Sequence, residues 1–262
     1  MLKKNYINSA IVQKEVIKRL MDRMSLINIL PNSIIDIGSG IGLSSEPLLK
    51  SYTESNLIMY DYSIDALKSS VIDKNEKVNI VCGEFKSLPF ENDSFDIVFS
   101  SSSLHWEDDI SLSFSEIYKI LKPGGLFFFS TYGPDTLTEL RSAWEPVDNR
   151  RHVNDFYDMH DIADLMLNLG FMDTVVDSER IIMKYENVKH IQKDLKNIGS
   201  HIMKKQERNN SLCSKGKMEA MYREYENFRQ QDGLLPVTYE VIYGHGWKKV
   251  KPLNLKNVKQ DY

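Results

Sequence analysis

The sequence predicts an α/β fold with a doubly wound, seven-stranded, mostly parallel sheet and a helical insertion or cap. Two observations lead to this prediction. Short apolar runs alternate with helix-like segments from residue 33 to residue 131, which is the order of a parallel sheet with crossover helices. These runs are also apolar throughout, as expected of strands that are buried on both faces.

The first elements are a helix, a strand and a glycine-rich turn. The helix is predicted over 9–26, because apolar residues recur every four positions and charged residues lie opposite them; the recurring residues are Val12, Val16, Leu20 and Met24. The run SIIDIGSGIG (33–42) predicts a strand that ends in three glycines. A helix over 43–52 follows, in which Pro47 is tolerated near the first turn.

The next elements continue the alternation of strand and helix. Strands are predicted at 57–61, 78–82, 95–101 and 126–131. A helix capped by Ser63 follows the first of them. A helix over 111–121 precedes the last strand, and the breakers KPGG (122–125) are expected to end it.

The second half predicts one more helix, two more strands and an insertion. The helix over 158–170 has Asp158 as its cap and Gly170 as its stop. The strands are 174–186 and 237–247, and the Lys-rich stretch of about 187–232 between them is too long for a bare loop. We therefore expect a single domain over 1–262, divided into an N-terminal helical cover (1–30), a sheet core (31–135), the sheet completion with its insertion (136–247) and a basic, frayed tail (248–262).

The composition excludes several classes of protein. The 262 residues carry two cysteines, Cys82 and Cys213, at a spacing that suits neither a disulfide framework nor a zinc site, and Cys82 is expected to be a small core residue. The net charge of −4 argues against a nucleic-acid partner. No run approaches a membrane span, and the N-terminus lacks the apolar segment of a signal peptide. We expect a cytoplasmic monomer with no metal and no membrane contact.

The strongest chemical pattern is a glycine-rich turn after the first strand together with an acid that ends the second. Asp36 precedes Gly38, Gly40 and Gly42, and Asp61 ends the next strand. Glycines let the backbone approach a ligand closely, and a carboxylate at this position suits a ribose diol. The spacing G-x-G-x-G differs from the G-x-G-x-x-G of pyrophosphate binders. The pattern predicts a nucleoside-containing cofactor at the carboxyl edge of the sheet.

Further motifs extend this pattern to a known superfamily. GEFKSLPF (83–90), SSSLHW (101–106) and LKPGG, together with DIGSGIG, resemble the class I methyltransferases, which have a Rossmann-like fold and use S-adenosylmethionine as methyl donor. The resemblance implies that Glu84 and Phe85 contact adenine, and that Asp61 and Tyr62 contact ribose and adenine. It places Gly38 at the methionyl end, with Ser100 and Ser101 nearby.

A closer resemblance covers nearly the whole chain. GLSSEPLLK, SSSLHWEDDI, STYGPDTLTELRSAW, HVNDFYDMHDIADLM and TYEVIYGHGW are similar to the malonyl-[acyl-carrier protein] O-methyltransferases of biotin synthesis, the BioC family. The resemblance implies methyl transfer from S-adenosylmethionine to the free carboxylate of malonyl-[acyl-carrier protein] or malonyl-CoA, without a metal. The residues leave open which of the two carriers is preferred.

Several side chains are candidates for positioning the substrate. They are Tyr6, His105, Trp106, Tyr132 and Arg141. Arg141 suits a carboxylate or a thioester oxygen, and equally suits a plain surface position; His105 suits a cavity wall. An acidic carrier protein favours a basic docking surface, for which the insertion offers Lys189, Lys193, Lys196, Lys204, Lys205, Arg208, Lys215 and Lys217.

Three other functions remain open at this point. The first is a methyltransferase-like assembly factor of respiratory complex I that hydroxylates an arginine, a family with similar SSLHW, GPDTL and TY…GW patterns. The second is a class I methyltransferase acting on a small molecule such as a quinone precursor. The third is a cofactor-binding module without catalysis.

Overall fold

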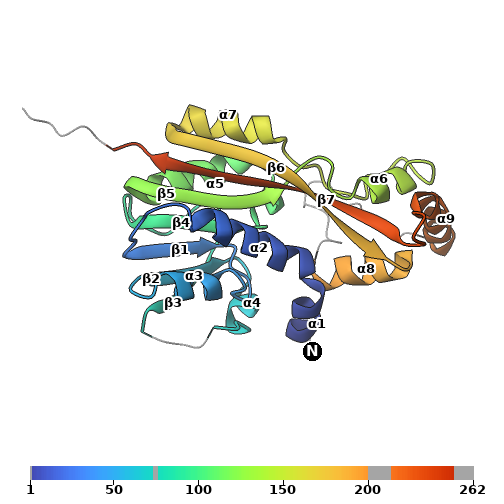
Figure 1. Cartoon of the computed structure of the whole chain (residues 1–262), viewed down its shortest axis with the longest axis horizontal. Helices are drawn as coiled ribbons and strands as arrows, with labels where there is room; N and C mark the ends of the chain where they lie inside the picture. Colours follow the sequence, from blue (N-terminus) through green and yellow to red (C-terminus); the bar gives the residue numbers. More distant parts are fainter. Residues whose placement is uncertain (1, 73–75, 200–213, 251–262) are drawn as a thin grey trace, which may run out of the picture.

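Seven strands form one sheet in the order β3-β2-β1-β4-β5-β7-β6 (Figure 1). The computed structural model describes residues 2–72, 76–199 and 214–250. Neighbouring strands among the first five run parallel, whereas β7 pairs antiparallel with both β5 and β6. This confirms the predicted seven-stranded, mostly parallel sheet. The strands are β1 (Ser33–Ile37), β2 (Asn56–Asp61), β3 (Val78–Cys82), β4 (Phe95–Ser101), β5 (Leu121–Tyr132), β6 (Phe171–Tyr185) and β7 (Leu235–Lys248).

Helices cover both faces of this sheet, which makes it doubly wound. The helices are α1 (Leu2–Ser9), α2 (Ile11–Met24), α3 (Ser45–Ser51), α4 (Ile64–Lys68), α5 (Ile110–Ile120), α6 (Thr138–Trp144), α7 (Met159–Leu169), α8 (Val188–Asn197) and α9 (Lys215–Tyr225), with short 3₁₀ turns at Leu104–Trp106 and Glu226–Phe228. Buried side chains of α2 and α3 join one core cluster, and those of α5 and α7 join the other. Successive residues of a strand point to opposite faces of the sheet, so Ile34 belongs to the first cluster and Ile35 to the second.

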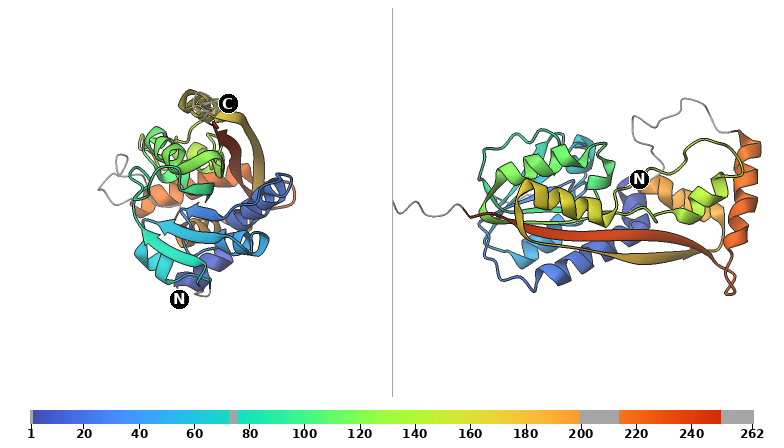
Figure 2. Two further views of the ribbon diagram at one scale, coloured as in Figure 1. Left: turned by 90° about the vertical axis from the view of Figure 1, so that its left-hand side faces the viewer. Right: turned by 90° about the horizontal axis from the view of Figure 1, so that it is seen from above.

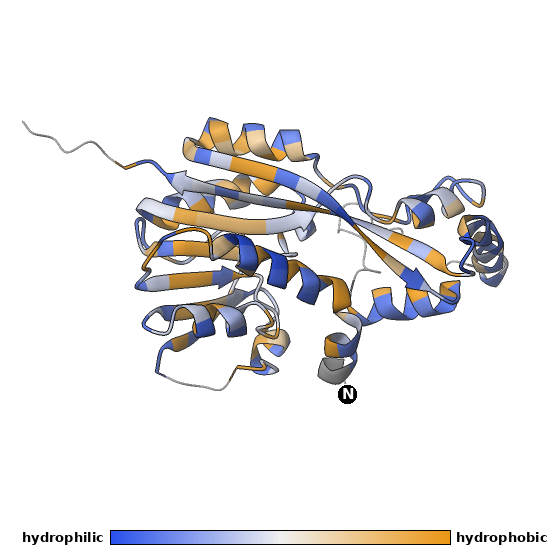
Figure 3. Cartoon of the chain, in the orientation of Figure 1, coloured by the Kyte–Doolittle hydropathy of each residue, from blue (hydrophilic) through white to orange (hydrophobic). Residues whose placement is uncertain are grey.

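The buried stripe of α2 follows the predicted pattern. Val12, Val16, Leu20 and Met24 are all at most 4% exposed. Figure 3 shows the result as hydrophobic patches along α2 that alternate with hydrophilic ones. The predicted helix over 9–26 corresponds to α2, and a separate helix that was not predicted, α1, ends at Ser9 just before it.

One sequence expectation is wrong and one strand boundary differs. Cys82 is exposed, because β3 is an edge strand and only partly covered. The KPGG segment follows the end of α5 at Ile120, as predicted. The strand after it begins earlier than the predicted residue 126, because β5 starts at Leu121 and has a register shift between Phe95 and Ile97 of the partner strand. Cys213, Lys204, Lys205, Arg208 and the tail beyond residue 250 lie outside the described residues.

The antiparallel pair β6 and β7 extends beyond the parallel strands. Figures 1 and 2 show that the far half of this pair carries α6, α8 and α9, on the side where the parallel strands have their carboxyl ends. Tyr225 of α9 is fully buried there and donates a hydrogen bond to the carbonyl of Pro236 in β7 (2.9 Å). The extended pair therefore holds a cap beside the edge where the glycine turn lies.

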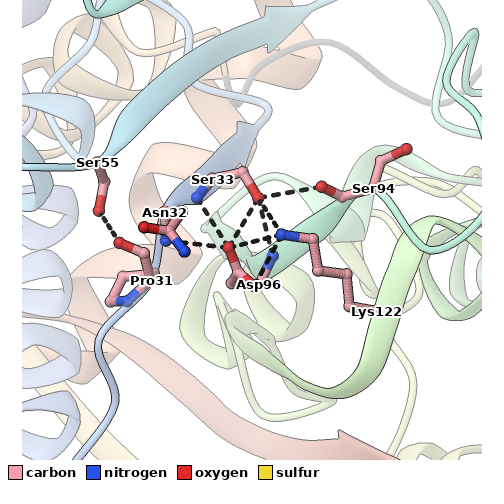
Figure 4. Close-up of polar contacts among 7 residues, drawn as sticks. All are labelled: Pro31, Asn32, Ser33, Ser55, Ser94, Asp96 and Lys122. Atoms are coloured by element: carbon pink, nitrogen blue, oxygen red, sulfur yellow. Dashed lines mark hydrogen bonds and ion pairs between the residues drawn. The ribbon is translucent and has the colours of Figure 1, made fainter.

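The amino edge of the sheet is held by one carboxylate (Figure 4). Asp96 of β4 accepts hydrogen bonds from the backbone amides of Asn32 and Ser33 (3.0 and 2.9 Å) and from the Ser33 hydroxyl. Lys122 of β5 lies 2.9 Å from both of its oxygens. These contacts hold the pKa of Asp96 below its usual range against a partial desolvation that opposes them. The Asp96 carboxylate thus joins β1, β4 and β5 at the edge opposite the glycine turn.

We expect Asp96→Ala to lower the free energy of unfolding by about 2 kcal/mol, because two amides and an ammonium lose a charged acceptor. Urea denaturation monitored by circular dichroism measures this loss. Asp164→Ala, which changes an exposed aspartate of α7, is the matched control and should cost less than about 0.5 kcal/mol. Equal stability of the two variants would contradict the role of Asp96.

Candidate cofactor turn and substrate cavity

Three glycines after β1 adopt a backbone conformation that favours glycine. Gly38, Gly40 and Gly42 have φ values of +74°, +53° and +87°. A Cβ at Gly38 would lie 2.2 Å from the Cβ of Ser103 and 3.0 Å from the ring of Phe85. A Cβ at Gly40 would meet no atom within 4 Å. The space beside Gly38 is therefore filled by the side chains of Ser103 and Phe85, whereas the space beside Gly40 is open.

The end of β2 holds this turn in place. The amides of Gly38 and Ser39 both donate to the carbonyl of Tyr60 (2.7 and 3.1 Å). The amide of Gly40 donates to one carboxylate oxygen of Asp61 (2.9 Å), and the amide of Ser63 donates to the other (2.8 Å). Burial raises the pKa of Asp61, while these two amides oppose the rise. Asp61 thus lies beside the glycine turn, as expected of two neighbouring parallel strands.

Asp36 lies beneath the turn. It is fully buried, and one of its oxygens accepts hydrogen bonds from the hydroxyls of Ser44 and Ser45 (2.6 Å each). Within the described residues its other oxygen has no hydrogen-bond partner. Burial raises the pKa of Asp36 to about 6. In this structure Asp36 joins β1 to the start of α3.

The segment after β3 lies on the other side of the turn. Phe85 is buried, whereas the Glu84 carboxylate is exposed and pairs with the ammonium of Lys86 (3.0 Å). The hydroxyl of Tyr60 donates to the carbonyl of Glu84 (2.9 Å). Tyr62 is 77% exposed. These residues come together at the carboxyl ends of β2 and β3.

The end of β4 completes this edge. The hydroxyls of Ser100 and Ser103 lie 2.7 Å apart, and Ser103 also donates to the carbonyl of Ile37 in β1 (3.2 Å). The hydroxyl of Ser101 lies 3.4 Å from that of Ser130 in β5. Ser103 is the residue that sequence reasoning missed, although it lies within the SSSLHW motif.

Tyr6 of α1 lies near the same edge. Burial raises the pKa of its phenol, and the Asp61 carboxylate raises it further. At the end of the same helix, the hydroxyl of Ser9 donates to Asp194 of α8 (2.9 Å) and accepts from Asn197 (2.9 Å). These bonds fasten the helix that carries Tyr6 to the cap.

A cavity of about 330 Å³ opens between the sheet edge and the cap. His105, Trp106 and Tyr132 line it together, with the rings of His105 and Tyr132 4.6 Å apart. Burial raises the pKa of the Tyr132 phenol, which accepts a hydrogen bond from Gln13 (3.4 Å). The walls of this cavity are largely apolar and aromatic. The other lining residues are Thr136, Leu137, Leu140, Trp144, His152, Val153, Asn154, Phe156, Gln192, Leu195, Lys196, Met218 and Tyr239.

Arg141 does not line this cavity. It lines a neighbouring one of about 470 Å³ and donates hydrogen bonds to the carbonyls of Pro134 (2.9 Å) and Asn154 (3.5 Å). Of the lysines in the insertion, Lys196 lines the first cavity and Lys217 pairs with Asp148 (3.0 Å). Within the described residues, no group of three or more His, Cys, Asp or Glu side chains is placed to hold a metal ion, and no helix is long and apolar enough to cross a membrane.

The buried charge of Asp36 predicts a pH-dependent stability. Its pKa is about 6 in the fold and near 4 in the unfolded chain, so the ionised form destabilises the fold. As the pH falls from 7 to 4.5, the wild type should gain about 2 kcal/mol of unfolding free energy relative to Asp36→Asn, whose amide is uncharged throughout. Urea denaturation of both proteins at each pH measures the difference. A constant difference across this range would show that Asp36 is not buried as an ionised group.

Similarities to known proteins agree with this arrangement. A family model described as a methyltransferase domain matches residues 35–129. The solved structure of the YcgJ protein of Bacillus subtilis has a TM-score of 0.62 at 15% identity, covering 88% of this chain and 98% of that one. Phosphoethanolamine N-methyltransferase 2 of Haemonchus contortus, solved with S-adenosylhomocysteine, has a TM-score of 0.58 at 18% identity, covering 89% and 52%. At such identities the likeness shows the fold alone.

Curated relatives extend the similarity over the cap. The malonyl-[acyl-carrier protein] O-methyltransferase 1 of Coxiella burnetii is 38% identical over 244 residues, which cover 93% of this chain and 83% of the relative. The malonyl-[acyl-carrier protein] O-methyltransferase of Gallionella capsiferriformans is 37% identical over 257 residues, covering 95% and 88%. The chain therefore belongs to the malonyl-[acyl-carrier protein] O-methyltransferase family, within the class I methyltransferases.

Proposed function

We propose that this protein transfers the methyl group of S-adenosylmethionine to the free carboxylate of malonyl-[acyl-carrier protein]. The product is the malonyl methyl ester that starts pimeloyl and biotin synthesis in the cytoplasm. The observation that carries this proposal is the 38% identity to a relative of that name over 93% of the chain. The match includes the segments that line the cavity as well as the sheet core. It favours this function over an arginine hydroxylase or a small-molecule methyltransferase.

The glycine turn is suited to the cofactor. The open space beside Gly40 accepts a ligand against the backbone, and the neighbouring Asp61 carboxylate offers an acceptor for a ribose hydroxyl. The Glu84 carboxylate, which pairs with Lys86, would accept a hydrogen bond from the adenine amino group, and Phe85 would contact the adenine ring. Gly38, Ser100 and Ser101 would then lie toward the methionyl end. Asp36 holds the chain after the turn through Ser44 and Ser45, and the amide of Gly42 donates to the carbonyl of Ser39 within the turn.

The cavity is suited to an acyl chain that carries a carboxylate. Tyr132, His105 and Trp106 lie at its sheet end, and Tyr6 lies within electrostatic range of both Asp61 and Tyr132. The malonyl end would therefore meet the methyl group between Tyr6 and Tyr132. Apolar walls and the cap exclude water there, which favours a reaction in which a carboxylate and a sulfonium lose their opposite charges.

The reaction needs no base. A malonyl carboxylate is already ionised at neutral pH, because carboxyl groups of this kind have a pKa of about 4 or below. Catalysis then consists of aligning the carboxylate oxygen, the methyl carbon and the sulfur, and alignment of this kind contributes roughly 7–11 kcal/mol in favourable cases. The oxygen forms a bond to the methyl carbon as the carbon–sulfur bond breaks, and S-adenosylhomocysteine leaves.

The glycine turn gives a test of the cofactor site. We expect Gly40→Ala to abolish measurable S-adenosylmethionine binding while lowering the unfolding free energy by only about 1–2 kcal/mol, the usual cost of a left-handed alanine. Gly38→Ala should cost clearly more stability, because its Cβ would lie 2.2 Å from Ser103. Isothermal titration calorimetry and urea denaturation measure the two quantities. If Gly40→Ala bound S-adenosylmethionine as tightly as the wild type, the cofactor site could not lie at the glycine turn.

The reaction itself is tested with a matched pair of substrates. Malonyl-[acyl-carrier protein] incubated with S-adenosylmethionine should gain one methyl group by mass spectrometry, and acetyl-[acyl-carrier protein], which lacks the carboxylate, should gain none. The rate should stay flat between about pH 6 and pH 8, because the substrate loses no proton in this range. Methylation of the acetyl substrate, or of neither substrate, would overturn the proposal.

A further inference from the structure

Two cavities lie side by side at the cap. The first, beside Tyr132 and His105, and the second, of about 470 Å³, share Trp144, His152 and Val153 as a common wall. The rings of Trp144 and His152 stack in that wall with centroids 3.6 Å apart. Arg141 in the middle of α6 and residues between 145 and 155 form the rest of the second cavity. Its chemistry differs from that of the apolar first cavity, because three arginines line it.

Most of the acidic side chains in this second cavity are already paired. One oxygen of Asp148 lies 2.8 Å from His152 and the other 3.0 Å from Lys217 of α9. These partners hold the pKa of Asp148 well below its usual range. Asp155 pairs with Arg151 (2.7 Å). Glu145 is the remaining acid of the lining, and it is exposed.

Arg141 has no such acidic partner among the contacts that the structure describes. The half-buried guanidinium donates to two backbone carbonyls, those of Pro134 and Asn154, which hold it in place and carry no net charge. Its remaining N–H groups can pair with an anion. Arginine suits phosphate oxygens because its planar group donates two parallel hydrogen bonds. The second cavity is therefore suited to a phosphate.

The proposed substrate carries a phosphate at the end of its arm that lies away from the reacting carboxylate. A carrier protein holds its malonyl group as a thioester on a pantetheine arm, and a phosphate joins the far end of that arm to the carrier. If the carboxylate lies at Tyr132, the apolar part of the arm fills the first cavity and the phosphate lies beyond the shared wall. Arg141 lines the second cavity, whereas Tyr132 lines the first. The two cavities thus match the two parts of the arm in order.

We propose that Arg141, with the second cavity around it, binds the phosphate of the phosphopantetheine arm. This inference rests on the proposed function and assigns Arg141 to the carrier end of the substrate, away from the malonyl carboxylate. Arg150 and Arg151 line the same cavity, and Arg151 balances Asp155 there. Arg141 is a binding residue that selects substrates by their phosphate.

Two substrates that differ only in the phosphate test this. They are malonyl-phosphopantetheine and malonyl-pantetheine. We expect the wild type to prefer the first by about tenfold in kcat/KM, the contribution of a charge-assisted hydrogen bond. In Arg141→Gln the preference should fall to about onefold, because the KM for the phosphorylated substrate rises about ten times more than the KM for malonyl-pantetheine.

Two further variants keep the test sharp. Arg223→Gln removes the same charge from an exposed position of α9 outside both cavities, and should keep the tenfold preference. Arg141→Lys keeps a cation that can donate to the two carbonyls, and should lower the preference at least threefold even if Arg141→Gln does not fold. No phosphate preference in the wild type, an unchanged preference in both Arg141 variants, or an equal loss on both substrates would overturn the inference. Failure of the wild type to methylate either substrate would instead overturn the proposed function.

Discussion

The candidate cofactor site depends on the hydrogen bonds that the glycine turn makes to the carbonyl of Tyr60. This carbonyl lies at the end of β2 and accepts the amides of both Gly38 and Ser39, so the chain that leaves β1 turns back onto the neighbouring strand. Only this sharp turn brings the amide of Gly40 to the carboxylate of Asp61. The turn requires left-handed φ values at three positions, which glycine adopts without a steric penalty. Asp36 supports it from below at the cost of a buried charge.

The cap depends on a different constraint, the antiparallel pairing of β6 and β7. Thirteen register partners from Phe171 to Tyr185 carry this pair past the end of the parallel strands, where α6, α8 and α9 pack. The hydrogen bonds of Ser9 with Asp194 and Asn197 then join α1 to α8. The sheet core is shared with structures of about 15–18% identity. The cavities are built largely from the cap, and this is where substrate selection is expected to reside.

Sequence patterns predicted the core elements well and the boundaries less well. The strands of the parallel core and the stripe of α2 follow from apolar periodicity, because burial acts on each residue locally. Cys82 was wrongly expected in the core, because an apolar run does not say which strand lies at the edge of a sheet. The KPGG segment follows the end of α5, as its breakers predict, but β5 begins earlier than expected. The segment lies where the register with β4 shifts, and Lys122 pairs there with Asp96.

In the candidate site, too, some features follow from the sequence and others only from tertiary packing. By itself the sequence determined the glycine turn, Asp61 and the family resemblance, because these lie in short motifs whose spacing reports the local backbone. Tertiary structure alone decided that Ser103 closes over Gly38, that Tyr6 lies near Asp61, and that Arg141 lines the second cavity. It also decided that residues as distant as Trp106, Gln192 and Tyr239 share one cavity. Contacts of this kind arise where separate segments pack, and no local pattern of residues encodes them.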